Sequence, residues 1–281
     1  MGAGVVVNTN ISSLHAARVL SQNRTDLESA MARLASGKRL NSASDDAAAA
    51  SVAAKMKADI RSTDVAVRNI NDGISLFQTV DGASSEVENI LIRMRELAVQ
   101  MTNGTYSDGD RVNANKEFVA LTAEIERIAT KSAFNRVKIA DGGDVTGMKI
   151  QSGAAEDDNL AATELTLPDL RTATSSLGVS GAAISTATGA AAAVTAVDAA
   201  IIEVAGFRAD TGATINRLGF ALSNAQNVSQ RLQEALSGLQ DADYAAESAA
   251  LARGMVLAQA GSAMLAQANQ APQYVLMLLK A

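Results

Sequence analysis

The 281-residue chain contains no cysteine, no tryptophan and only two prolines, and aromatic residues make up 3% of it. Without cysteine there can be no disulfide, no thiolate nucleophile and no cysteine-bound zinc or iron–sulfur centre. Few aromatic side chains also leave little bulk for the core of a globular enzyme. Alanine, the strongest helix former, is abundant instead, at 57 residues. With so little proline, this composition predicts long helices that pack closely along their length.

The charge balance is mildly acidic, with 24 Lys and Arg against 30 Asp and Glu and a net charge of -6. Nucleic-acid binding needs clustered cations that displace counterions from phosphate, so this balance argues against it. Residues 1–8 lack the positive segment of a secretory signal peptide, so we expect any export to use a route that reads no cleaved signal. Polar residues interrupt the apolar stretch 255–279, so the sequence predicts no membrane span.

Apolar residues recur with helical spacing near the start of the chain and again in its middle. Four of them share one helix face that ends before Gly37, namely Leu20, Leu27, Met31 and Leu34. Two seams with the alternating spacing of a coiled coil follow, at Val87, Ile90, Met94, Leu97 and Met101 and at Phe118, Leu121, Ile125 and Ile128. Because a turn cluster at 103–110 separates them, the sequence predicts an antiparallel helix pair.

Helical periodicity stops near Phe134, and short β-type runs at 137–139, 148–151 and 165–167 predict a small antiparallel β element. Residues 172–197 are rich in Ala, Thr, Ser and Gly, and they fit either a linker or the start of the next helix.

The C-terminal part of the chain is again helical and ends in an apolar segment. A third seam runs through Ile215, Leu218, Leu222, Ala225, Ser229, Leu232, Leu236 and Leu239. A last helix then carries Leu251, Met255, Ala258, Leu265 and Ala268, and residues 275–279 are all apolar. Such a segment is a liability in water, so we expect it to be buried against other chains. The design is that of a subunit.

Candidate catalytic and metal-binding residues are few. His15 is the single histidine and cannot form a two-histidine metal site, so we interpret it as a polar residue on a helix face. Asp45 and Asp46 are interpreted as helix caps, and the acidic run 156–158 as a solvated loop that lacks the spacing of a calcium loop. The nucleophile-elbow, phosphate-loop and dinucleotide-binding motifs do not occur. The sequence therefore predicts neither an enzyme nor a cofactor.

Several long segments resemble bacterial flagellins. They are residues 7–14, 33–48 and 67–75, the string Arg93-Met94-Arg95-Glu96-Leu97-Ala98-Val99-Gln100, Phe134-Asn135, and residues 260–270 with Pro272. The resemblance covers about residues 5–160 and 205–281. It implies a mainly α fold, namely a long antiparallel coiled-coil bundle with a small β-hairpin element and paired N- and C-terminal helices.

The resemblance also implies a short form with domains D0 and D1 only. Its parts would be an N-terminal D0 helix at 1–45, N-terminal D1 helices with the β element at 46–170, a short variable region at 171–200, a C-terminal D1 helix at 201–240 and a C-terminal D0 helix at 241–281. Such a subunit leaves the cell unfolded through the flagellar type III export apparatus. It then polymerises with itself into the extracellular flagellar filament that serves motility.

Partners and interface residues follow from the same resemblance. The implied partners are the flagellar export chaperone, the filament cap and hook-junction proteins, and the vertebrate innate receptor TLR5. Receptor binding would use Arg93, Leu97 and Glu117. The polymerisation and chaperone interface would comprise Leu20, Leu27, Met31, Leu34, Leu251, Met255, Leu265, Val275, Leu276, Leu278 and Leu279. We expect no nucleic-acid partner.

Three alternatives stay open on the sequence. A hook–filament junction protein of the same superfamily shares the terminal motifs but caps or adapts the filament. An unrelated secreted coiled-coil adhesin needs neither terminal motif. A flagellin with an embedded metallopeptidase needs a larger insert and more than one histidine.

Overall fold

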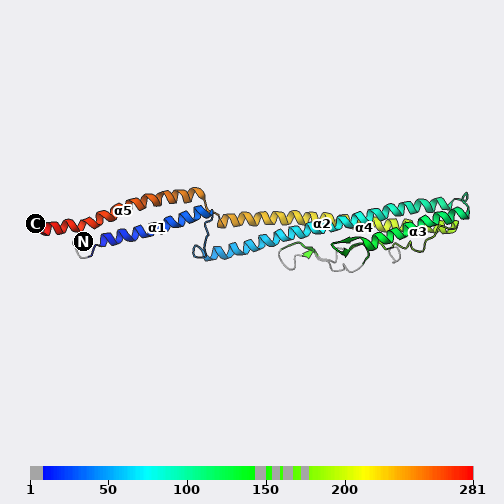
Figure 1. Cartoon of the computed structure of the whole chain (residues 1–281), viewed down its shortest axis with the longest axis horizontal. Coiled ribbons are helices and arrows are strands. Elements are labelled where there is room, and N and C mark those ends of the chain that lie inside the picture. Colours follow the sequence, from blue (N-terminus) through cyan, green and yellow to red (C-terminus); the bar gives the residue numbers. More distant parts are fainter. Residues whose placement is uncertain (1–8, 143–149, 154–158, 161–166, 172–176, 281) are drawn as a thin grey trace. The chain divides into compact units, whose positions relative to one another are not determined.

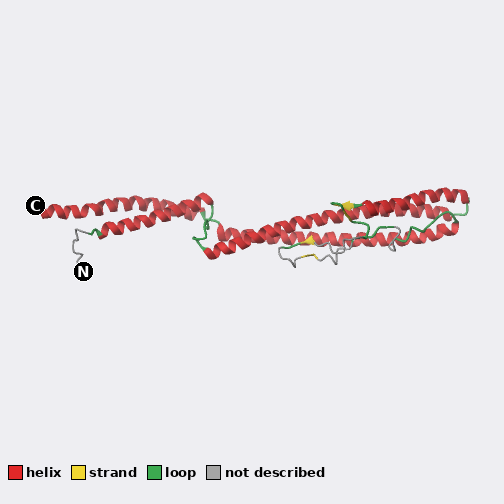
Figure 2. Ribbon diagram, turned by 60° about the horizontal axis from the view of Figure 1, so that its bottom comes forward, coloured by secondary structure: helices red, strands yellow, loops and turns green. Residues whose placement is uncertain are grey.

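The computed structural model describes residues 9–142, 150–153, 159–160, 167–171 and 177–280. Its elements in chain order are α1 (Ile11–Ser36), α2 (Ala47–Thr102), α3 (Asp108–Lys131), β1 (Ala133–Phe134), β2 (Val137–Lys138), β3 (Ile150–Gln151), β4 (Asn159–Leu160), α4 (Ala187–Gln240) and α5 (Tyr244–Lys280). Long helices with two short antiparallel strand pairs confirm the predicted mainly α fold (Figures 1 and 2).

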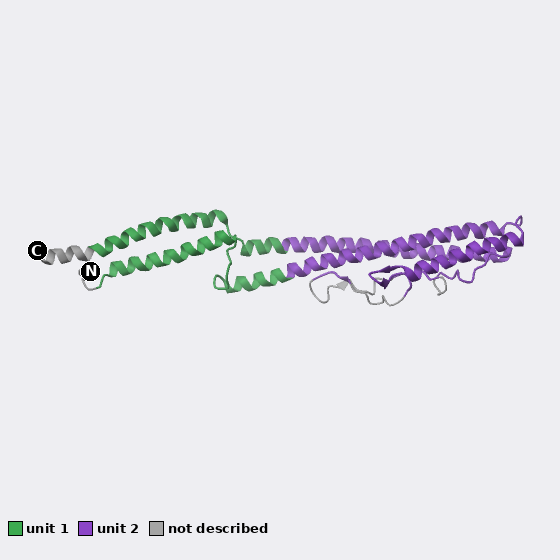
Figure 3. Cartoon of the chain, viewed as in Figure 1, with its two compact units in different colours: residues 1–58, 232–281 green, residues 59–231 purple. Residues whose placement is uncertain are grey.

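The chain divides into two compact units (Figure 3). Unit 1 comprises residues 1–58 and 232–281, and unit 2 comprises residues 59–231. Helices α2 and α4 therefore contribute residues to both units.

Polar side chains at the helix starts explain where several helices begin. The Asn10 side chain accepts a hydrogen bond from the Ser13 N–H at 3.0 Å at the start of α1. Ser107 and Asp110 form a reciprocal capping box at the start of α3. Asp46, interpreted from the sequence as a cap, accepts from the Ala49 N–H at 2.9 Å at the start of α2. These local bonds satisfy N–H groups that have no partner within the helix.

The core of unit 2 is a bundle of α2, α3 and α4, which lie side by side (Figures 1 and 2). The two predicted seams face this core: Val87, Met94, Leu97, Met101, Phe118 and Ile125 are buried, while Ile90, Leu121 and Ile128 are partly buried. Leu91, which lies outside the predicted seam, is also fully buried. Helix α4 meets them with small residues such as Ala190, Ala193 and Ala200, which allow the helices to approach closely.

The β element is smaller than the sequence runs suggest. Strand β1 pairs with β2 and strand β3 pairs with β4, both antiparallel and two residues long. Of the predicted runs, 137–138 and 150–151 form strands, and the buried Ile139 follows β2. Residues 148–149 and 165–166 lie outside the described residues. A two-residue turn at Asn135 and Arg136, both with positive φ, joins β1 to β2.

Helix α4 begins at Ala187, inside the segment that the sequence left open between a linker and a helix start. The Thr186 hydroxyl accepts a hydrogen bond from the Gly189 N–H at 3.1 Å, and this bond starts the helix. Residues 187–197 are therefore helical, whereas residues 172–176 lie outside the described residues.

Unit 1 contains the predicted pairing of the terminal helices, because α1 and α5 lie side by side in opposite directions (Figure 1). At one end of the pair, the two connecting segments hydrogen-bond to each other. The Arg39 N–H donates to the Gln240 carbonyl at 2.8 Å, and the Ala242 N–H donates to the Gly37 carbonyl at 3.0 Å. Gly37 has a φ of 68°, the left-handed conformation that ends α1.

Two described helical stretches are long and apolar enough to cross a membrane, by length and composition alone. They are Ala187–Gln240, with a hydropathy of 1.7, and Tyr244–Gln270, with a hydropathy of 1.2. The stretch 255–279, for which the sequence predicts no membrane span, overlaps the second of these helices. Helix α4 packs Val197 and Val204 into the core of unit 2, as the core helix of a helical bundle does.

Candidate functional site

Unit 1 presents several bulky apolar side chains to solvent. At least half of each of the following is exposed: Ile11, Leu14 and Val19 on α1, and Met255, Val256, Leu257 and Met264 on α5. Clustered exposed apolar side chains mark surfaces that bind other proteins or membranes. A two-helix pair offers each helix only one neighbour, which explains why so much apolar surface is left uncovered.

The residues predicted for a polymerisation interface divide into three groups. Leu20, Leu27, Leu34, Leu251 and Leu265 are partly buried within the α1–α5 pair, and Met31 and Met255 are 43% and 54% exposed. Val275, Leu276, Leu278 and Leu279 belong to α5, but their side chains lie outside the described residues.

Two glycines on α5 let the apolar side chains of α1 come close. A Cβ at Gly254 would lie 3.5 Å from Leu27 atoms, and a Cβ at Gly261 would lie 3.3 Å from Leu20 Cδ1. Glycine at these positions therefore brings the two helices together along the leucines that the sequence predicted.

Polar contacts that the sequence did not predict also join α1 to α5. Asn10 Nδ2 donates to the Ala268 carbonyl at 2.7 Å, and Asn23 Nδ2 donates to the Gly254 carbonyl at 2.9 Å. The signal for Asn10 was its type and place as a helix cap, whereas nothing local marks Asn23, which lies inside α1. These bonds fix the register of the pair.

An ion pair adds to the same interface. Arg33 Nη1 lies 3.2 Å from Glu247 Oε1, with Glu247 the more buried of the two side chains. The pair links the last turn of α1 to the first turn of α5, where each charge also complements the dipole of its own helix.

A groove of about 340 Å³ runs between α1 and α5. It is lined by His15, Ala16, Val19, Leu20, Asn23, Leu257, Ala260, Gly261 and Met264. His15 is the only ionisable residue among these lining residues. The groove is thus apolar with one titratable side chain at its edge.

Charged residues gather on the outer side of α2 and α3 in unit 2. Arg93 Nη2 lies 2.9 Å from Glu117 Oε1, and Arg93 Nη1 lies 3.1 Å from Glu96 Oε2. The hydrogen bond to Glu117, followed by that to Glu96, raises the pKa of the Arg93 guanidinium above its ordinary value. Of the three residues predicted for receptor binding, the structure thus joins Arg93 to Glu117, while Leu97 is 4% exposed and packs in the core.

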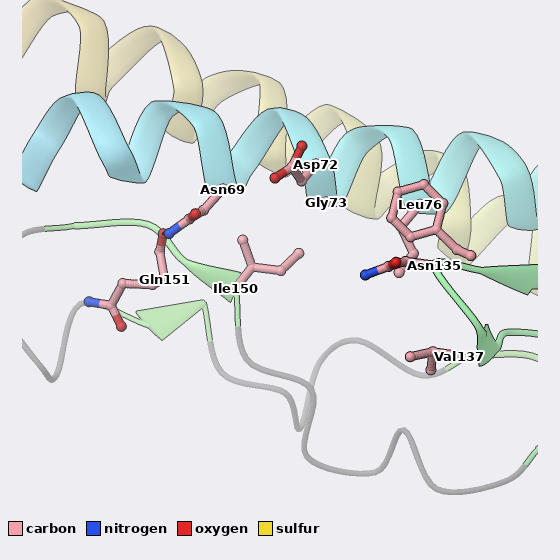
Figure 4. Close-up of a pocket in the computed structure, with 9 residues that line it drawn as sticks. Asn69, Asp72, Gly73, Leu76, Asn135, Val137, Ile150 and Gln151 are labelled. Carbon is pink, nitrogen blue, oxygen red and sulfur yellow. The ribbon is translucent and has the colours of Figure 1, made fainter.

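A second groove, of about 640 Å³, lies between α2 and the β element (Figure 4). Its lining mixes apolar side chains with the amides and carboxylate of Asn69, Asp72, Asn135 and Gln151. Ile150 reaches toward α2 at Gly73, where a Cβ would lie 2.4 Å from Ile150 Cδ1 (Figure 4). Gly73 is therefore the residue that lets β3 pack on α2.

The described residues contain no cluster of three or more His, Asp or Glu side chains placed to hold a metal ion. The acidic run 156–158 lies outside the described residues. Asp45, interpreted as a helix cap, instead accepts hydrogen bonds from the Asn41 and Ser42 N–H groups at 3.0 and 2.9 Å in the segment before α2, so of the two only Asp46 caps that helix. Hydrogen bonds from the Ser42 and then the Asn41 backbone lower its pKa.

Comparison with known proteins connects these surfaces to a family. Residues 7–144 match the bacterial flagellin N-terminal helical region, and residues 194–279 match the bacterial flagellin C-terminal helical region. A flagellin from Halalkalibacterium halodurans is 42% identical over 98% of this chain and 100% of its own length. A flagellar filament 30.7 kDa core protein from Treponema maltophilum is 35% identical over 98% of this chain and 100% of its own length.

Among solved structures, a protein described as flagellar hook-associated from Vibrio parahaemolyticus is similar in fold. It superposes with a TM-score of 0.58 and 14% identity over 70% of this chain and 100% of that one. At this identity the likeness concerns the fold alone, whereas the sequence relatives match over nearly their full length. The chain therefore belongs to the bacterial flagellins, with both of the family's terminal helical regions present.

Proposed function

We propose that this flagellin is a structural subunit that polymerises with itself into the filament that drives motility. The observation that carries the proposal is the uncovered apolar surface of α1 and α5 in unit 1. Burying one large apolar side chain fully contributes about 1.5–3 kcal/mol. Several such side chains on each copy supply enough free energy for association once the entropy of binding is subtracted.

Truncation tests the proposal most directly. Removing residues 262–281 deletes Met264 and the rest of α5 but leaves unit 2 intact. We expect the truncated chain to form no filaments by electron microscopy, while far-UV circular dichroism still shows a folded helical bundle. Normal filaments from this variant would contradict the proposal.

A point substitution separates surface chemistry from chain length. Val256 on α5 is 67% exposed and Val119 on α3 is 53% exposed. Val256→Ser should raise the critical concentration for assembly, and the matched substitution Val119→Ser in unit 2 should change it less. Equal effects would mean that unit 1 does not carry the main contacts.

Export is the second part of the proposal. We infer that the chain leaves the cell through the flagellar type III apparatus, with an export chaperone covering α5 until secretion. The exposed apolar side chains of α5 support this, because such a surface needs a cover before assembly. The chain should stay inside cells that lack the apparatus, and secretion from such cells would refute the inference. Contacts with the filament cap and hook-junction proteins belong to the same proposal.

Recognition by the receptor TLR5 is a second candidate function, which the joined pair Arg93–Glu117 favours. Both side chains are about half exposed, so a partner can reach them, whereas Leu97 would act by holding the helix surface in place. Arg93→Ala and Glu117→Ala should each lower the response of receptor reporter cells to purified monomer. The exposed pair Arg127–Glu124 on α3 provides a matched control in Arg127→Ala. No response to the unmodified monomer would reject this function.

A further inference from the structure

The end of unit 1 that holds the start of α1 is almost free of charge. Residues 1–23 contain only His15 and Arg18 among the five residue types Asp, Glu, Lys, Arg and His, and residues 254–279 contain none of them. The Asn10 and Asn23 hydrogen bonds place these two segments against each other. No acidic side chain in either segment can therefore compensate a positive charge there.

His15 lies at the edge of the apolar groove in this region. Across the groove α5 contributes only Leu257, Ala260, Gly261 and Met264. On its own helix, the nearest charged residue is Arg18, one turn further on, which is also a cation. In the described part of the chain, the imidazole makes neither a hydrogen bond nor an ion pair.

We propose that His15 makes assembly pH-dependent: a neutral imidazole is accommodated when a second copy covers the groove, and its protonation opposes assembly. The inference rests on the proposed self-assembly and names a regulation of that same surface. The occupant is the uncharged α5 face of a second copy, where Val256 and Met264 are 67% and 65% exposed. Covering His15 with such a face removes its water and offers no anion, so the charged form is disfavoured.

Proton linkage sets the size of the effect. Histidine side chains ordinarily titrate near pH 6.5, so about ten in eleven are charged at about pH 5.5 and few at about pH 8. If only subunits with a neutral His15 can assemble, the critical concentration should be roughly tenfold higher at the lower pH. Association favours the neutral form of the imidazole. Assembly should therefore become stronger, and the critical concentration lower, as the pH rises from about 5.5 to about 8.

His15 is the only histidine in the chain, so no other histidine contributes to a pH effect in this range. The full chain is polymerised at about pH 5.5 and about pH 8 at constant ionic strength, and the soluble fraction is measured after sedimentation. In His15→Gln the ratio of the two critical concentrations should fall to about one. His15→Lys carries a permanent charge and should assemble poorly at both pH values. The α-amino group also titrates in this range, but it is the same in every variant.

Gln22→Lys is the matched control for adding a cation to α1. Gln22 is exposed, does not line the groove, and already donates to Asp26 Oδ1 at 3.1 Å, so a lysine there has an acid beside it. This variant should assemble like the unmodified chain at about pH 8.

An unchanged tenfold ratio in His15→Gln, or normal assembly of His15→Lys, would overturn the inference. Assembly of the unmodified chain that does not change with pH would also overturn it. Failure of the unmodified chain to assemble at either pH would instead count against self-assembly.

Discussion

Ile150 packs against α2 at Gly73, and a single methyl group of Ile150 decides whether a substitution at Gly73 stabilises or destabilises the fold. Gly73 is buried in α2, and a Cβ there would lie 2.4 Å from Ile150 Cδ1 but 3.4 Å from Cγ1 and 3.6 Å from Cγ2. Gly73→Ala gains about 1 kcal/mol of helix propensity, and it loses about 1–3 kcal/mol to overpacking. The net expectation is a destabilisation of about 0–2 kcal/mol.

Shortening Ile150 to valine removes only the clashing atom. Ile150→Val alone should cost about 0.5–1.5 kcal/mol, since Ile150 is 7% exposed. In that background the nearest remaining Ile150 atoms are at ordinary contact distance. Gly73→Ala should then stabilise unit 2 by about 1 kcal/mol, so the effect of the same substitution reverses sign.

Urea unfolding followed by far-UV circular dichroism measures the four members of this double-mutant cycle. Hydrogen exchange of residues 66–80 reports the same change locally. Gly82, exposed on the same helix with no atom within 4 Å of its Cβ position, is the control. Gly82→Ala should stabilise by about 1 kcal/mol whether residue 150 is isoleucine or valine. If Gly73→Ala stabilises the unmodified chain as Gly82→Ala does, the packing of β3 on α2 described above is wrong.

Three further predictions concern the bundle of unit 2. Phe118 is fully buried, so Phe118→Ala should lower the free energy of unfolding in urea by about 3–5 kcal/mol. Val119 is its exposed neighbour, and Val119→Ala should lower it by less than 1 kcal/mol. Arg111 is 7% exposed and donates to two carbonyls at the end of α2, so Arg111→Met should cost about 1–3 kcal/mol in the same assay. Side-chain and then backbone hydrogen bonds with Ser107 lower the pKa of Asp110 from its ordinary 3.8. A carboxyl whose pKa is lower in the folded than in the unfolded chain stabilises the fold at pH values above the unfolded-chain pKa. This stabilisation is lost as the pH falls through the folded-chain pKa. Stability should therefore drop below about pH 3.8, and less steeply in Asp110→Asn, as urea midpoints across this range would show; parallel curves for the two proteins would contradict the assignment.

Features that depend on residues close in sequence were predictable. The spacing of Val87 and Met94 on α2, like that of Phe118 and Ile125 on α3, specifies a buried helix face, because a helix repeats its side-chain direction every few residues whatever surrounds it. Asp46 was likewise interpreted correctly as a cap. Of the predicted turn cluster 103–110, residues 103–107 form the turn and residues 108–110 already belong to α3. Chain segments long enough to match a family carried the identification with flagellins.

Other features depend on residues far apart in sequence, and only the tertiary structure decided them. Nothing local places Asn23 beside Gly254 or Arg93 beside Glu117, since each contact requires two helices to pack in one register. Leu97 has the spacing of a seam residue and also occurs in the predicted receptor motif, but packing put it in the core.

The shortage of aromatic residues and the wealth of alanine determined by themselves that the helices would be long and closely packed. They did not determine which apolar side chains stay uncovered. That choice follows from the pairing of α1 with α5, because a two-helix layer covers only one face of each helix. The exposed Val19 and Val256 are consequences of that pairing, and the same pairing places the exposed His15 beside an apolar groove.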